Sequence, residues 1–265
     1  MWELVNPINV EEFKNRVQNA SEFPHFCLDD FLKEEFAEAI FESFPDYQYA
    51  QKVGLEFKAV NEKKKVQITD SKLFPPPIKQ LNDLLASAEF VEMLSYVFDI
   101  DSLQSDPTLI GGGIHQTDSG GRLDVHVDFN FVEKNQMHRR LNLLLYFNKN
   151  WKEEYGGYLD LWDKDVKNRI GYFEPKFNRL CGFVTSDISF HGVTPIHCPK
   201  GVVRQSFATY YYTKDAPEGW DGKKHSTIFK PRPDEFLRGH VSMPIEKLGK
   251  RFKKIINAIK YKLIS

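Results

Sequence analysis

Two histidines and one aspartate are the side chains of this sequence best suited to chemistry. His126 and Asp128 stand in Asp-Val-His-Val-Asp-Phe-Asn at residues 124–130, and His191 stands in a later Phe-His-Gly. In an extended strand alternate side chains share a face, so His126 and Asp128 point the same way. With His191 they form the two-histidine, one-carboxylate set that binds Fe(II) and leaves positions open for a co-substrate and oxygen. The alternatives are a hydrogen-bonded surface pair and a core histidine.

Arg204 is the second candidate, because it begins the segment Arg-Gln-Ser-Phe-Ala-Thr-Tyr at residues 204–210. Alternation places Arg204 and Ser206 on one face of a strand, which can turn toward the metal ligands. A guanidinium is always charged, and its planar fork matches a carboxylate in bidentate geometry. We therefore expect Arg204 to bind an anion. The alternative is an internal ion pair with Asp160 or Asp187.

Short apolar segments between turn residues must position these side chains. Strands are predicted at 141–148, 158–162 and 180–184, and Gly156-Gly157 marks a turn between the first two. Apolar residues at helical spacing precede them and predict a helix that Asp29-Asp30 opens and Pro45 ends. A second helical region is predicted from Pro77 through Phe98, and Gly111-Gly112-Gly113 marks the passage to the strands.

Composition favours one compact domain. The chain has 265 residues, of which 41% are hydrophobic and 14% aromatic, enough for a sizeable core. Its 36 basic and 37 acidic residues give a net charge of -1, so no nucleic-acid partner is expected. Its three cysteines, Cys27, Cys181 and Cys198, form no Cys-x-x-Cys and are expected to be reduced. No signal peptide or membrane-spanning stretch is visible, which predicts a cytoplasmic protein.

Taken in order, these motifs resemble the 2-oxoglutarate and Fe(II)-dependent dioxygenases, in the prolyl-4-hydroxylase-like branch. The resemblance runs from about Phe23 to Thr213 and includes Phe-Pro-His-Phe-Cys-Leu-Asp-Asp-Phe-Leu at residues 23–32. One difference is that Arg204 follows His191 by thirteen residues (204 − 191), further than is usual, so we expect a longer turn through residues 194–201. The roles that the resemblance implies are iron ligation by His126, Asp128 and His191, and binding of the distal 2-oxoglutarate carboxylate by Arg204 with Ser206 and Tyr146.

The resemblance also implies a fold and a chemistry. The expected fold is mainly β within an α+β chain: a double-stranded β-helix, or cupin-like jelly roll, at about residues 106–215, with the helices of residues 1–105 packed outside. Residues 1–240 would form one oxygenase domain. The cofactors would be Fe(II), 2-oxoglutarate and O2, with ascorbate in support, and the reaction would hydroxylate an unactivated C–H bond and release succinate and CO2. The retained Asp128 argues against halogenation, because related halogenases lack that carboxylate.

The substrate is less clearly indicated. A small molecule or sugar is favoured over a prolyl or other amino-acyl residue of a protein, because no accessory peptide-binding module is visible. A non-catalytic jelly-roll ligand sensor is the alternative from another class. Asn142 can bind co-substrate or substrate, or can satisfy the interior. The residues placed near the site by position, each with a turn, surface or packing role as the alternative, are His115, Gln116, Arg122, Asn130 and Trp162. The segment 132–140, with Lys134, His138, Arg139 and Arg140, is expected to be a solvated loop, and a preference for an acidic substrate is the alternative.

The pattern of apolar and basic residues at 241–265 predicts a basic amphipathic helix at the C-terminal end of the sequence. Seven basic residues surround its apolar stripe, and Glu246 is the single acidic residue near them. Such a helix can dock on the outside of the sheet with its lysines solvated, or can hold the protein on an anionic membrane surface. The sequence does not predict an oligomeric state. The stripe consists of Leu248, Phe252, Ile255, Ile256, Ile259 and Leu263.

Overall fold

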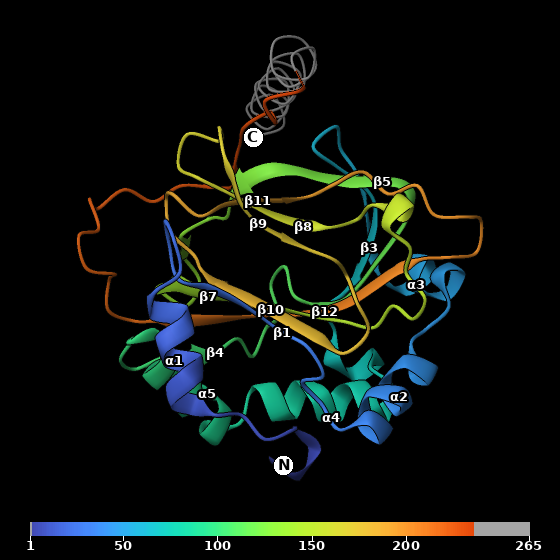
Figure 1. The fold of residues 1–265 in the computed structure, drawn as a ribbon, viewed down its shortest axis with the longest axis horizontal. Coiled ribbons are helices and arrows are strands. Elements are labelled where there is room, and N and C mark those ends of the chain that lie inside the picture. The colour runs from blue at the N-terminus through green and yellow to red at the C-terminus, as the bar shows by residue number, and fades with distance from the viewer. Residues whose placement is uncertain (1, 236–265) are drawn as a thin grey trace, which may run out of the picture.

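The computed structural model describes residues 2–235, in which antiparallel strands form two facing layers (Figure 1). In this view β1, β7, β10 and β12 form the lower layer and β5, β8, β9 and β11 the upper one. This is the predicted double-stranded β-helix, and the site lies between its layers. The strands along the main path are β1 (His25–Leu28), β10 (Arg179–Val184), β7 (Met137–Tyr146), β12 (Arg204–Thr213), β5 (Gly113–Val127), β11 (Phe190–Val193), β8 (Leu159–Trp162) and β9 (Arg169–Phe173).

Strand β5 belongs to both layers. Its first residues, 113–117, pair with β12, whereas residues 123–126 pair with β11. Between the two stretches Gly120 has a φ of 78°, a left-handed conformation that favours glycine, and the strand bends there. The remaining strands are short or pair at the side of the main path: β2 (Leu55–Lys58), β3 (Glu62–Ile68), β4 (Gln104–Ser105), β6 (Phe131–Val132) and β13 (Ile228–Phe229).

Helices cover the lower layer on its outer side, as expected (Figure 1). Alternation along β7 explains the packing, because Leu143 and Leu145 join the helical core while Asn142 and Leu144 line a cavity between the layers. Full burial of each such leucine contributes about 1.5–3 kcal/mol. The helices are α1 (Val10–Gln18), α2 (Glu34–Ser43), α3 (Tyr47–Val53), α4 (Pro76–Leu85) and α5 (Ala88–Phe98), with 3-10 turns at Trp2–Leu4, Ser71–Leu73 and Glu153–Tyr155.

Three element predictions need correction. The N-terminal part is not purely helical, since β1 to β4 lie within it. The first predicted helix starts later than expected, at Glu34, because Asp30 has a φ of 51° and lies outside helical geometry. The predicted region from Pro77 to Phe98 is two helices, because Ser87 interrupts it and its hydroxyl accepts a hydrogen bond from the Phe90 amide to cap α5.

The segment 132–140 is also not the predicted solvated loop. Strand β6 ends at Val132 and β7 begins at Met137, so a four-residue turn, 133–136, separates them. This places Arg139 inside β7, where it is buried. A register shift in the pairing with β12, where Tyr211 lies opposite Leu141 but Tyr212 lies opposite Arg139, turns that side chain to the cavity face of the strand.

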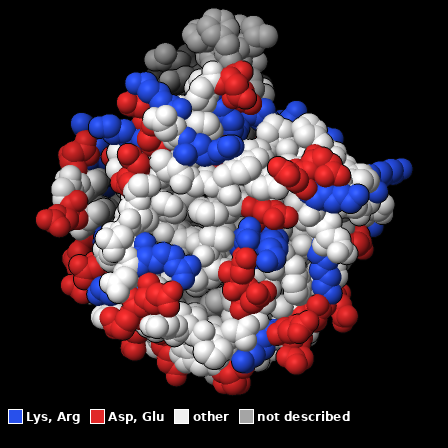
Figure 2. Space-filling view, in the orientation of Figure 1, with Lys and Arg blue, Asp and Glu red and all other residues white. Residues whose placement is uncertain are grey.

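The remaining expectations concern thiols, surface charge and the tail. All three cysteines are free, and Cys27 lies opposite Cys181 across β1 and β10. On the face in Figure 2, acidic and basic side chains are interspersed among uncharged ones. No helix among residues 2–235 is both long enough and apolar enough to cross a membrane. The helix predicted for residues 241–265 lies outside the described residues.

Candidate active site

His126, Asp128 and His191 come together at the ends of β5 and β11. His126 lies directly opposite His191 in the strand pairing, and their ring centres are 4.2 Å apart. His126 Nε2 lies 3.4 Å from Asp128 Oδ1, and His191 Nε2 lies 3.7 Å from Asp128 Oδ2. The ligand atoms of the three residues all lie within 4.8 Å of one another. One metal ion can therefore bind all three side chains, as the sequence pattern predicts.

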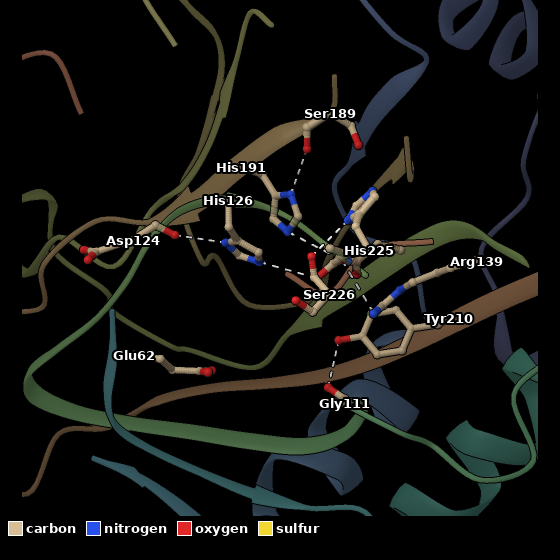
Figure 3. Close-up of polar contacts among 12 residues, drawn as sticks. Glu62, Gly111, Asp124, His126, Arg139, Ser189, His191, Tyr210, His225 and Ser226 are labelled. Atoms are coloured by element: carbon tan, nitrogen blue, oxygen red, sulfur yellow. Dashed lines mark hydrogen bonds and ion pairs between the residues drawn. The ribbon is translucent and has the colours of Figure 1, made fainter. Parts of the chain in front are cut away.

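The second nitrogen of each imidazole fixes the direction of its ring. His126 Nδ1 lies 2.9 Å from the Asp124 carbonyl oxygen, and His191 Nδ1 lies 3.0 Å from that of Ser189 (Figure 3). A carbonyl only accepts, so each Nδ1 carries a proton and Nε2 is the nitrogen of each ring that can bind a metal. Burial, together with the nearby His126, lowers the pKa of His191 to about 4. At neutral pH His191 is therefore uncharged, which is the form that binds a metal.

Asp128 is held in its charged form. Burial alone would raise its pKa, but Arg139 and the two histidines outweigh burial and keep the pKa well below its usual range. An Arg139 nitrogen lies 3.6 Å from Asp128 Oδ2, and Asn142 Nδ2 donates a hydrogen bond to the same oxygen at 3.3 Å. Asn142 thus holds a predicted metal ligand through its side-chain amide, whereas the sequence left open whether it binds co-substrate or substrate or satisfies the interior.

Arg204 is buried at the start of β12 with part of its hydrogen-bonding capacity unused. Its Nε donates to the Gly157 carbonyl at 2.7 Å, whereas Nη2 has no partner among the described residues. The Tyr146 ring centre lies 4.9 Å from the guanidinium carbon, and Ser206 lies opposite Tyr146 across the strands. The hydroxyls of Tyr146 and Ser206 are also buried without a hydrogen-bond partner. Such unpaired buried groups are costly, so this cluster fits a carboxylate that accepts from all three.

The acidic partners considered for Arg204 are engaged elsewhere. Asp160 binds Arg232 through both carboxylate oxygens, at 2.7 and 3.0 Å. Asp187 lies 2.9 Å from His225 Nε2. Arg204 therefore makes no ion pair with either carboxylate, and its positive charge faces the cavity between the layers.

A cavity of about 410 Å³ lies between the layers, and the three predicted metal ligands and Arg204 all line it. Of the predicted substrate residues, His115 and Arg122 line the cavity. His115 Nε2 lies 3.0 Å from the Gly111 carbonyl oxygen, and burial, then Lys65 and Arg204, hold its pKa well below the ordinary value. His115 is therefore a neutral hydrogen-bonding group.

Three predicted substrate residues do not line the cavity. Gln116 points away from it because side chains alternate, and its amide donates to the Pro45 carbonyl. Asn130 holds the chain near His225, whose amide donates to Asn130 Oδ1 at 3.0 Å. Trp162 packs in a separate apolar cluster with Val127 and Phe190. Position along the chain was a poor guide to which of these residues face the cavity.

Several other cavity residues lie outside the motifs of the predicted site. Arg139 is 2% exposed, and its guanidinium carbon lies 3.5 Å from the centre of the Tyr210 ring. The hairpin formed by β2 and β3 contributes one wall, and residues after β12 contribute another. The sequence of neither wall contains a recognisable motif. Both reach the cavity because β3 and β13 pair with β5, which is distant in sequence. The lining residues from these walls are Phe57, Ala59, Asn61, Glu62, Lys65, Gln67, Thr227 and Phe229.

Comparison with known families decides the class of this site. Residues 112–212 match the family model described as the 2OG-Fe(II) oxygenase superfamily, and this range includes the three predicted metal ligands and Arg204. Residues 112–212 therefore form a domain of this superfamily. This oxygenase is accordingly a 2-oxoglutarate-dependent dioxygenase that uses Fe(II), 2-oxoglutarate and O2.

Solved structures share the fold of this oxygenase at low sequence identity. A prolyl hydroxylase from Trichoplax adhaerens, in complex with a peptide fragment of the hypoxia inducible factor oxygen degradation domain, is 16% identical; the match has a TM-score of 0.58 and covers 81% of this chain and 96% of that one. A Pseudomonas putida prolyl-4-hydroxylase is 18% identical, with a TM-score of 0.52 and coverage of 76% and 98%. A search of curated proteins found no match to the oxygenase.

Proposed function

We propose that this oxygenase hydroxylates an unactivated C–H bond, with His126, Asp128 and His191 as the Fe(II) ligands. The observation that carries the proposal is the set of three ligand atoms within 4.8 Å of one another on the wall of the cavity between the sheet layers. Two neutral imidazoles and one carboxylate form the donor set that suits Fe(II) and leaves coordination positions open. Bound Fe(II), with 2-oxoglutarate and O2, would supply the oxidising chemistry, in which one oxygen atom of O2 enters succinate as CO2 is released and the other enters the product.

The side chains around the ligands have separate roles in this proposal. Arg204, Ser206 and Tyr146 bind the distal carboxylate of 2-oxoglutarate, since each has an unpaired buried polar atom. The carbonyls of Asp124 and Ser189 orient the imidazoles. Asn142 holds the Asp128 carboxylate through a hydrogen bond. The two sheet layers exclude bulk water.

For the substrate we propose a small molecule or a sugar. The cavity of about 410 Å³ must also hold 2-oxoglutarate, so the space left suits a group of sugar or side-chain size. A protein prolyl residue is the second candidate, because two structures of the same fold are prolyl hydroxylases. We also propose that residues 1–240 act as one oxygenase domain, since helices and strands share a common core.

Turnover tests the proposal directly. The full chain is supplied with Fe(II), ascorbate and 2-oxoglutarate under air, with a cell extract or with proline-containing peptides, and succinate is measured. A hydroxylase also yields a product heavier by about one oxygen mass, so the arm that yields it identifies the substrate class. The His126→Ala variant is the control. Absence of both turnover and metal binding would contradict the proposal and favour a ligand sensor.

A further inference from the structure

The two strands that carry the histidines are paired irregularly. His191 lies opposite His126, but Val193 lies opposite Leu123, so β5 uses three steps (126 − 123) where β11 uses two (193 − 191). This is a β-bulge, which bends its strand and redirects side chains. The extra residue changes the course of β5 directly before His126. The geometry of the bulge therefore determines where His126 points relative to His191.

The side chain of Arg232 lies at this bulge. Its Nη2 lies 3.4 Å from the Leu123 carbonyl oxygen on β5, and Nε and Nη2 both donate to Asp160 on β8. Asp160 lies opposite Gly192, the residue that follows His191 on β11. Arg232 is 6% exposed and Asp160 is fully buried. One buried guanidinium thus contacts both neighbours of β11 beside the metal ligands.

Gly192 lies where the guanidinium leaves no room for a side chain. A Cβ atom at Gly192 would lie 2.8 Å from Arg232 Nη2, 2.9 Å from the Leu123 carbonyl oxygen and 3.0 Å from Asp160 Oδ1. All three contacts are closer than Cβ atoms ordinarily approach. The glycine in the Phe-His-Gly motif is therefore matched to Arg232, a residue forty positions further along the chain (232 − 192).

The backbone before Arg232 is also bound to β5, the strand that carries His126. Phe229 pairs with His126 in β13, and their ring centres are 5.3 Å apart. The Lys230 amide then donates to the Val125 carbonyl at 2.8 Å, within the bulged stretch of β5. The chain that delivers Arg232 thus runs along the ligand strand itself.

We propose that Arg232 is a positioning residue for the metal site, because it holds the bulge that sets the spacing of His126 and His191. The inference rests on the proposed metal site. A buried ion pair is generally weak in net stability, because desolvation offsets its attraction, and such pairs can instead specify one geometry. Held by Asp160, Arg232 fixes the position of β5 relative to β8 and β11.

The test is Co(II) titration of the full chain without 2-oxoglutarate, with circular dichroism to confirm folding. Because partners behind metal ligands typically contribute 10- to 100-fold in affinity, Arg232→Gln and Gly192→Ala should each weaken Co(II) binding by about that factor. The double variant should be no weaker than the worse single variant, since both changes disturb one contact. Ile228→Ala is the matched control, because this side chain is exposed on β13, the short strand that precedes Arg232. It should bind Co(II) like the wild type.

A second variant separates positioning from stability. Replacing the pair by apolar residues, Arg232→Met with Asp160→Leu, is often neutral for folding. The folded double variant should still bind Co(II) about 10- to 100-fold more weakly than the wild type. If it binds as tightly, or if Gly192→Ala does, the positioning role is wrong while the metal site stands. If wild type and His126→Ala bind Co(II) equally, the proposed metal site itself is wrong.

Discussion

Arg139 and Asp128 form a buried ion pair inside the cavity, with 3.6 Å between a guanidinium nitrogen and a carboxylate oxygen. Tyr210 and Phe129 lie against the same guanidinium, at 3.5 and 4.5 Å from ring centre to guanidinium carbon. The arginine thus compensates the Asp128 charge before a metal binds. Once a metal binds the Asp128 carboxylate, the metal interacts with it more strongly than Arg139 does.

Replacement of Arg139 should therefore affect the metal-free and metal-bound proteins differently. Because Arg139→Leu leaves Asp128 charged and buried, the metal-free variant should lose about 3–5 kcal/mol of unfolding free energy. Metal should restore much of that loss, since it supplies a positive charge in place of Arg139. Denaturant unfolding with and without Co(II) measures both quantities. Equal stabilisation of variant and wild type by Co(II) would contradict this account.

The three predicted ligands should be indispensable for metal binding. His126→Ala or His191→Ala removes one of three protein ligands, so Co(II) affinity should fall by about 100-fold or more and succinate formation should cease. The measurement is metal titration alongside succinate release. Full activity in either variant would rule out the assignment. His25→Ala, at a partly buried histidine of β1 that belongs to neither cluster, is the control.

Arg204→Lys should separate co-substrate binding from metal binding. Lysine keeps a positive charge but loses the planar fork, so the 2-oxoglutarate concentration needed for half-maximal turnover should rise about 10- to 100-fold. Co(II) affinity without 2-oxoglutarate should stay at the wild-type level. An unchanged requirement for 2-oxoglutarate would place the carboxylate-binding group elsewhere. Ser206→Ala should give a smaller effect in the same direction, because it removes a neutral hydrogen bond.

Protonation of His115 should lower the unfolding free energy as the pH decreases from neutral. Burial, together with Lys65 and Arg204, lowers the pKa of His115 in the folded state, so the unfolded chain binds the proton first as the pH falls. The unfolding free energy should therefore decrease below about pH 6.5, and by pH 5 His115 should account for up to about 2 kcal/mol. In His115→Gln this part of the pH dependence should disappear from denaturant unfolding of the metal-free protein. Exposed His197→Gln is the control, and an identical slope in His115→Gln and wild type would refute the prediction.

The local features of the site could be predicted from the sequence, because alternation along a strand is a local property. His126 and Asp128 share a motif, and Arg204 and Ser206 share a face, so their grouping needed no knowledge of distant contacts. The face that each strand turns inward was harder to predict. His115 and Gln116 are adjacent, and only the Pro45 carbonyl, delivered by a distant segment, identifies Gln116 as the one that points away.

Features that depend on distant partners could not be predicted. A charged residue such as Arg139 is ordinarily expected in solvent. It is buried here because its guanidinium packs on the ring of Tyr210, which lies on another strand. Nothing near Gly192 in the sequence indicates why a glycine is needed there, because the reason is Arg232, forty positions further along the chain. The division of residues 77–98 into two helices was predictable in principle, because Ser87 followed by Glu89 and Phe90 has the composition of a helix N-terminus.

Because β5 bends from one layer into the other, this one strand contacts both the anion-binding cluster and the metal ligands. Thr117 pairs with Arg204 before the bend, and His126 pairs with His191 after it, so a single covalent segment fixes how far the anion-binding cluster lies from the metal ligands. Insertion of one residue between Thr117 and His126 would turn His126 to the opposite face of the sheet. Longer surface loops would leave this distance unchanged, because the length of one strand sets the separation of the metal ligands from the anion-binding cluster.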